Sequence, residues 1–229
     1  MQYRRFKAIP EAVSRMFGIS PKTEGIQKYE HPTLLKFRLL IQKDDYVPVL
    51  VAIERDPKKI DHLINLLSYP ECEVCAVVLL SHLAKSDFDI TPALQSLEEK
   101  LYSPDANVVS YAAAALTFHH MNKSNMQHVD SLFTDPSETV CFGASDALLF
   151  LALFGEQKAL IYLVGKVFAE DVGGAAKKIL QRIAEMGTDD VRKDLKRTIL
   201  DLEADMRVSP AIPCLEAYRE FHDILEALK

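Results

Sequence analysis

Thiols and imidazoles are the side chains of this sequence that could do chemistry, and both occur in close pairs. Cys72 and Cys75 form a Cys-x-x-Cys pair, which binds zinc or exchanges disulfides when a second pair or a βαβ unit accompanies it. His119 and His120 are adjacent, and His82 follows the cysteines along the chain. A metal or redox site is the chemistry that such residues would supply.

The spacing of these residues favours a structural role instead. A zinc site needs four ligands, and no second Cys-x-x-Cys or Cys/His pair accompanies Cys72 and Cys75. Neighbouring helical residues point about 100° apart, so His119 and His120 do not chelate a metal as residues i and i+4 would. We therefore expect small buried cysteines, and histidines in the core or at helix ends. A redox or metal role for the cysteine pair is the alternative.

Catalytic motifs are absent from the sequence. It has no glycine-rich phosphate loop, no Gly-x-Ser-x-Gly turn and no zincin helix. Catalytic groups can also be distant in sequence, so this absence favours a non-catalytic protein without deciding the matter. We expect no catalytic residue, no metal and no cofactor.

The composition favours a helical protein that does not bind nucleic acid. Glycine is scarce at 8 residues, and the net charge is -6, whereas proteins that bind a phosphate backbone are usually basic. The longest apolar run, residues 147–154, is far shorter than the roughly 20 residues that cross a bilayer. Four cysteines without a disulfide-like framework, and no signal-peptide pattern, indicate a cytoplasmic protein without a membrane span.

The elements that carry these residues belong to a repeat. Three times in the sequence a proline is followed four residues later by a valine: Pro70/Val74, Pro104/Val108 and Pro136/Val140. The three valines are 34 and then 32 residues apart, and a fourth valine, Val172, follows after another 32 residues. Positions four after, eight after and eleven before each valine predict one buried helical face: Val78, Ala112, Ala144, Ala176; His82, Leu116, Leu148, Leu180; Leu63, Leu97, Val129, Ile161. Each repeat thus predicts two antiparallel helices joined at a turn, which proline marks in the first three.

Two-helix units of this length, with a turn proline, a valine and a small-residue second helix, resemble divergent HEAT-like (armadillo-type) repeats. The resemblance covers residues 57–189 and implies an all-α fold, a right-handed α-solenoid of antiparallel helix pairs that binds other macromolecules. Many such repeats have arginine after the turn valine. Here that position holds Cys75, Val109, Cys141 and Gly173, so no subfamily is assigned.

The repeat also divides the chain. We expect N-terminal helices and a loop in residues 1–56, with a helix from about residue 8, a loop over residues 18–32 and a helix pair in residues 33–54 as a candidate truncated repeat. Four repeats follow in residues 57–189, and capping helices in residues 190–229 complete one continuous domain.

The second helices of the first three repeats carry apolar residues on the side opposite the core, two, six and nine residues after each valine. These are the candidate partner-binding residues: Ala76, Leu80, Leu83, Ser110, Ala114, Thr117, Phe142, Asp146 and Leu149. A helix that is apolar all round is normally covered. Either a protein partner or a second copy covers this stripe, with Leu80, Leu83, Phe142 and Leu149 accessible in the isolated chain, or the chain's own ends do.

The function that follows is a non-catalytic protein–protein interaction scaffold, adaptor or regulator. The resemblance also implies alternatives, because some HEAT-like solenoids are DNA glycosylases and related repeat proteins are bilin lyases. A bacterial immunity-type inhibitor is a third alternative, since it would share the same scaffold.

Overall fold

The computed structural model describes residues 31–208 and 214–228, and within them it contains helices and no strand. The all-α prediction is therefore confirmed for this part of the chain. The predicted helix from about residue 8, and all but the end of the loop predicted over residues 18–32, lie outside the described residues. The α-helices are α2 (Pro32–Gln42), α3 (Val47–Arg55), α4 (Ile60–Asn65), α5 (Pro70–Lys85), α6 (Leu94–Lys100), α7 (Ala106–Asn122), α8 (Met126–Phe133), α9 (Glu138–Leu153), α10 (Gln157–Lys166), α11 (Gly173–Met186), α12 (Asp189–Val208) and α13 (Cys214–Ala227).

The predicted turns separate the two helices of each of the first three repeats. Pro70 begins α5, where its missing N–H costs no helical hydrogen bond, and Tyr69 before it is extended, with φ -105° and ψ 110°. Before α7 and α9 an aspartate makes the turn. The Asn107 backbone N–H donates to Asp105 Oδ1 at 2.8 Å, and the Ser137 N–H donates to Asp135 Oδ1 at 2.8 Å.

The described chain divides into two compact units, residues 31–115 and residues from 116 onward, and the division falls within α7. In the N-terminal unit α2 packs against α3, α4 and α5, and α5 also packs against the short 3-10 turn Leu66–Ser68 before it. The Arg38 guanidinium binds Glu71 and lies over the Tyr69 ring, 4.6 Å from its centroid. These contacts attach the predicted N-terminal helix pair to the first repeat.

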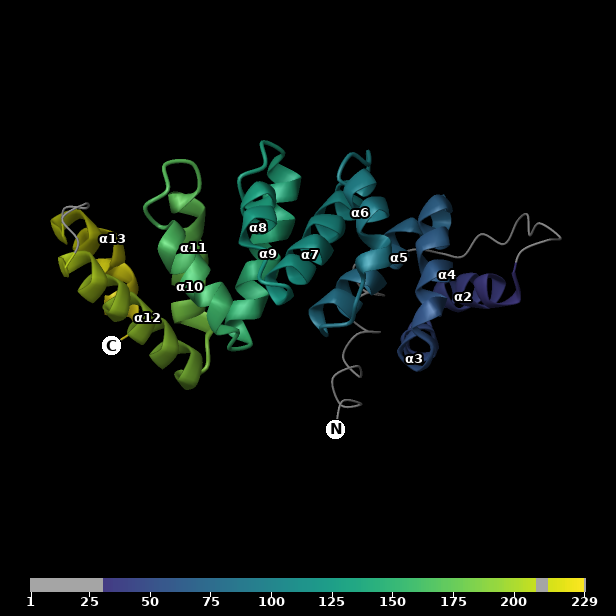
Figure 1. The fold of residues 1–229 in the computed structure, drawn as a ribbon, viewed down its shortest axis with the longest axis horizontal. Helices are drawn as coiled ribbons and strands as arrows, with labels where there is room; N and C mark the ends of the chain where they lie inside the picture. The colour runs from purple at the N-terminus through teal and green to yellow at the C-terminus, as the bar shows by residue number, and fades with distance from the viewer. Residues whose placement is uncertain (1–30, 209–213, 229) are drawn as a thin grey trace. The chain divides into compact units, whose positions relative to one another are not determined.

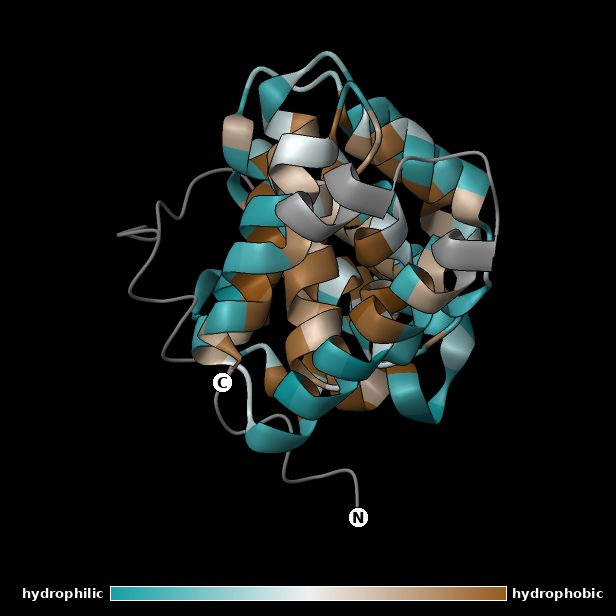
Figure 2. Ribbon diagram, turned by 90° about the vertical axis from the view of Figure 1, so that its left-hand side faces the viewer, coloured by the Kyte–Doolittle hydropathy of each residue, from teal (hydrophilic) through white to brown (hydrophobic). Residues whose placement is uncertain are grey.

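The C-terminal unit contains two sets of helices (Figure 1). The second helices pack on one another in order, α9 against α11 and α11 against α13, while α10 packs against α12 among the first helices. Each first helix also packs against its own second helix. Hydrophilic and hydrophobic residues alternate along these helices (Figure 2), as expected when one side of a helix faces its neighbours.

The predicted core face is buried, with one correction in the fourth repeat. The positions four after the valines, and the leucines eight after them, are all buried, and His82 is half-buried. Ile161 is 55% exposed, however, and Leu160 takes its place in the core. The predicted spacing was wrong here because repeat four lacks the turn proline and has one more residue between its two core faces. Leu160 lies 12 residues before Val172, whereas Val129 lies 11 before Val140.

Candidate functional site

Most of the predicted partner-binding stripe is covered by the protein. Six of its residues are buried, Ser110 is half-buried, and only Phe142 and Asp146 are exposed; the buried six are Ala76, Leu80, Leu83, Ala114, Thr117 and Leu149. The expectation that Leu80, Leu83 and Leu149 are accessible is therefore wrong. Buried residues occupy all sides of α5. The helix is apolar all round, and the rest of the protein encloses it, so it has no apolar side left for a partner.

In the third repeat a stripe of three exposed residues and the half-buried Phe150 follows i, i+4 spacing along α9. Phe142, Asp146, Phe150 and Phe154 are four residues apart and lie two, six, ten and fourteen residues after Val140. Phe142 is 59% exposed and Phe154, which follows the last turn of α9, is 75% exposed. The sequence prediction included Leu149, nine residues after the valine. Leu149 is buried, and the next residue, Phe150, is the one that continues the stripe.

The aromatic residues of this stripe are held in place from the core. The Phe118 ring is buried and meets the Phe150 ring edge to face, with centroids 6.0 Å apart. Phe150 in turn stacks on Phe154, with centroids 4.2 Å apart and planes inclined by 24°. An exposed aromatic ring is therefore supported by a continuous series of ring contacts that begins inside the fold.

The next second helix, α11, presents the equivalent positions of its own repeat. These positions are Gly174, Lys178, Arg182 and Met186, and all four are exposed. Arg182 Nη1 lies 4.0 Å from Asp146 Oδ1, an ion pair of two half-exposed side chains that adds little stability but connects α11 to α9. We call these eight residues, four from each helix, the α9–α11 face.

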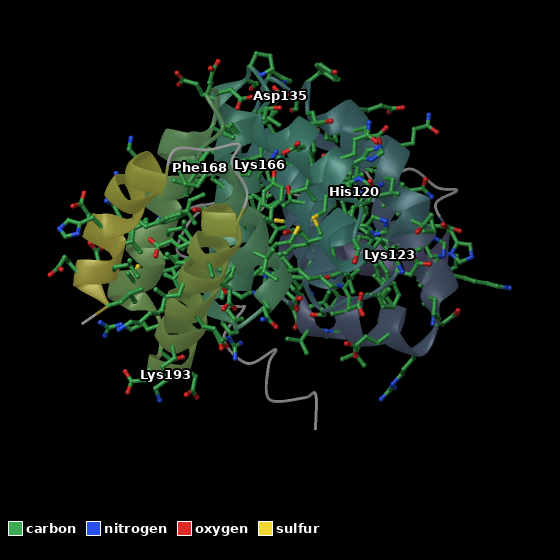
Figure 3. The ribbon with its side chains drawn as sticks, turned by 60° about the vertical axis from the view of Figure 1, so that its left-hand side comes forward. His120, Lys123, Asp135, Lys166, Phe168 and Lys193 are labelled. Carbon is green, nitrogen blue, oxygen red and sulfur yellow. The ribbon has the colours of Figure 1, made fainter. Side chains whose placement is uncertain are left out.

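A second polar group lies on the first helices of the same unit. Lys166 Nζ is 2.5 Å from Asp130 Oδ1, and the Tyr162 hydroxyl donates to the same oxygen at 2.8 Å. Burial alone would raise the pKa of Asp130, but hydrogen bonds from Lys166 and Tyr162 outweigh it and hold that pKa below its ordinary value. Lys166 is labelled in Figure 3.

This polar group binds α8 to α10 and does not have the properties of a catalytic site. Burial, followed by the adjacent Asp130 carboxylate, raises the pKa of Tyr162 far above the neutral range. A tyrosine in this state keeps its proton and serves as a hydrogen-bond donor. The lowered pKa of Asp130 likewise disfavours a role as a general acid.

Three of the seven histidines, His119, His120 and His128, form a cluster where α7 ends and α8 begins. The ring of His120, labelled in Figure 3, stacks on that of His128 with centroids 4.6 Å apart, and the His119 ring lies 5.3 Å from that of His120. Burial, and then the neighbouring His128 and His119, lowers the pKa of His120 to about 4. His120 is therefore a neutral ring at neutral pH, at a helix end as predicted.

The paired cysteines are buried, as predicted. The Cys75 sulfur lies 3.6 Å from the Tyr46 hydroxyl, and burial raises the pKa of its thiol despite that contact. A thiol in this state is less nucleophilic than a free cysteine. Cys141 donates to the backbone carbonyl of Phe133 at 3.2 Å.

Neither a metal cluster nor a membrane span is found in the part of the chain that the structure describes. No three His, Cys, Asp or Glu side chains of residues 31–208 and 214–228 are placed to hold a metal ion. None of the helices in these residues has both the length and the apolar character that crossing a bilayer requires.

Comparisons with known proteins add little to this description. No family model matches the chain, and no curated protein matches it. Among solved structures the chain is similar to the crystal structure of an engineered protein, with 19% identity and a TM-score of 0.41; the match covers 87% of this chain and 97% of the engineered one. A similarity of this degree assigns neither a family nor a function.

Proposed function

We propose that this protein is a non-catalytic protein-interaction scaffold, an α-solenoid of HEAT-like helix pairs that binds a protein through the α9–α11 face. The exposed aromatic residues of α9 carry this proposal. Phe142 and Phe154 present large apolar surfaces to solvent, and aromatic side chains are the residues that most often anchor protein interfaces. A surface of this kind suits a binding partner.

The contacts within the C-terminal unit support the repeat architecture. Phe118 and Phe150 contact one another and are 32 residues apart, which is also the interval between Val108 and Val140. The second helices α9, α11 and α13 pack on one another in chain order, as they do when repeats stack with nearest neighbours only. Stacked second helices would form one face, and the α9–α11 face is the exposed part of it.

Site-specific photo-cross-linking in an extract of the host organism tests this function. A benzophenone amino acid replaces Phe154 in one sample and Ile161 in a control, because Ile161 is an exposed apolar residue of α10, in the other set of helices. We expect a discrete protein adduct from position 154 and none from position 161. Equal labelling from both positions, or no adduct from position 154, would contradict the proposed function.

A further inference from the structure

We propose that the protein bound at the α9–α11 face is a second copy of this chain. The two faces would meet around a two-fold axis that runs between α9 and α11 and parallel to them. This inference rests on the proposed function and names its partner. It is carried by the residue types of the α9–α11 face, which complement one another between the two helices; Phe150 is half-buried and the other seven are exposed.

The symmetry decides which residues meet. α9 and α11 pack side by side, and both begin at the same end of the C-terminal unit (Figure 1). A two-fold axis between them places α9 of one copy against α11 of the other, with equivalent positions at the same height. Each contact then occurs twice, as in any two-fold interface.

All four of the resulting contacts are favourable in type. Asp146 meets Lys178 of the second copy, so that opposite charges face each other, and Phe150 meets Arg182, a cation over an aromatic ring. Phe154 meets Met186, which is 61% exposed, and the thioether packs well against the edge of a ring. Phe142 meets Gly174, which has no side chain to obstruct the ring.

The surroundings of Gly174 are compatible with this arrangement. A Cβ atom added at Gly173, its neighbour, would lie 2.3 Å from the Val167 carbonyl oxygen, so the fold itself requires that glycine. A Cβ added at Gly174 would have nothing within 4 Å. The fold thus leaves room for a side chain at Gly174. Almost any other residue would also stabilise this first turn of α11 more than glycine does. A ring from a second copy would occupy that room.

The charges of the face favour a second copy over an unrelated partner of one charge sign. Asp146 lies on α9 whereas Lys178 and Arg182 lie on α11, so each half of the face has a different sign. A strongly acidic partner would meet Asp146, and a strongly basic partner would meet the two cations. A surface with the same division, turned by the two-fold axis, pairs acid with base on both sides.

Sedimentation velocity of the full chain at micromolar concentration tests the inference. We expect the unaltered chain to be a dimer, and Phe154→Asp and Gly174→Gln to be monomers. The melting temperature of Gly174→Gln should be unchanged or higher, which separates loss of the interface from loss of the fold. Ile161→Asp is the matched control, because it places the same charge at an exposed apolar residue of α10, and it should remain a dimer.

Charge exchange identifies the occupant directly. Asp146→Lys alone would face Lys178, and Lys178→Asp alone would face Asp146, so each variant should be monomeric. Mixing the two should restore a dimer, because every Asp146–Lys178 contact then again joins a lysine to an aspartate. Restoration on mixing can only occur if two copies of this chain meet at these residues.

The outcomes separate this inference from the proposed function. A chain that is monomeric throughout the micromolar range, or a dimer that persists in both Phe154→Asp and Gly174→Gln, overturns the inference. If such a chain still forms a cross-linked adduct with another protein at position 154, the proposed function stands without the second copy. If it forms no adduct there, both are wrong.

Discussion

Phe118 of α7 and Phe150 of α9 occupy the same position in consecutive repeats, and their rings are in direct contact, with centroids 6.0 Å apart. Each lies ten residues after the valine of its own repeat, Val108 or Val140. Residues that are one repeat interval apart in the sequence are thus in contact in the structure. The contact joins the end of α7 to α9 through two residues that are 32 positions apart.

Phe118→Ala should destabilise the protein by about 3 kcal/mol, because it empties a buried ring site next to Phe150. Phe154→Ala removes a ring that is 75% exposed and should change the free energy of unfolding by well under 1 kcal/mol. Urea denaturation of both variants at a concentration where the chain is monomeric measures the difference. Equal losses of unfolding free energy in the two variants would show that Phe118 is no more buried than Phe154, and so that the series of ring contacts does not begin in the core.

The sequence predicted the helices well because each signal for them is local. Prolines and aspartates at the turns, together with apolar residues at four-residue spacing, place α5, α7 and α9 with little information from the rest of the chain. The exception is α10, where Leu160 and not Ile161 lies in the core. No local signal shows that the turn before α11 is one residue longer, so counting backward from Val172 selected Ile161.

The exposed face was harder to predict, because exposure depends on which neighbours a helix has. Leu80 in α5 and Phe142 in α9 hold equivalent sides of their helices, yet the first is buried and the second is exposed. Nothing in either helix distinguishes them. Phe150 and Phe154, however, had a signal: they continue the i, i+4 series that Phe142 and Asp146 begin. Following that series would have found the face.

Leu80→Asp should unfold the protein or lower its melting temperature severely, because Leu80 is completely buried and an aspartate there would be an unpaired charge. Phe142→Asp makes the same chemical change on the exposed stripe and should leave the monomer's melting temperature nearly unaltered. Thermal unfolding followed by circular dichroism compares them. A stable, cooperative Leu80→Asp variant would contradict the burial of α5.

Cys75→Ala should cost about 1 kcal/mol, since it leaves a small cavity and removes the sulfur beside the Tyr46 hydroxyl. Tyr46 keeps its bond to Asp44 Oδ1 at 2.5 Å, so the hydroxyl is not left unsatisfied. Denaturant unfolding measures the cost. Elemental analysis of the purified chain should find no stoichiometric zinc, and zinc that disappears in this variant would restore the metal interpretation of the Cys-x-x-Cys pair.

The stability of the protein should decrease as the pH falls from about 6.5 to about 4, because burial lowers the pKa of His62, His82 and His120. Burial lowers the pKa of His82 to about 4, with a smaller effect from Lys85, and burial with the adjacent imidazoles lowers that of His120 to about 4. Above pH 6.5 these rings are neutral in both the folded and the unfolded chain. Below it the unfolded chain takes up protons that the folded chain does not, so unfolding becomes more favourable.

This loss should reach up to about 3 kcal/mol for each of His82 and His120 and should level off near pH 4, where the folded rings also become protonated. Asp130 contributes in a separate range, since its pKa is lowered by its hydrogen bonds and its stabilisation is lost only as the pH falls through that lowered value. The free energy of unfolding, measured in urea at intervals from pH 8 to pH 2, distinguishes the two ranges, because the contribution of Asp130 is lost only below about pH 4.

His82→Gln combined with His120→Gln should flatten this profile between pH 6.5 and pH 4, because glutamine does not titrate. The comparison is of slopes, so any constant loss of packing from the two buried substitutions does not affect it. If the double variant lost stability over this range as steeply as the unaltered chain, His82 and His120 would not be the groups responsible, and His62 or carboxylates would have to account for the acid sensitivity.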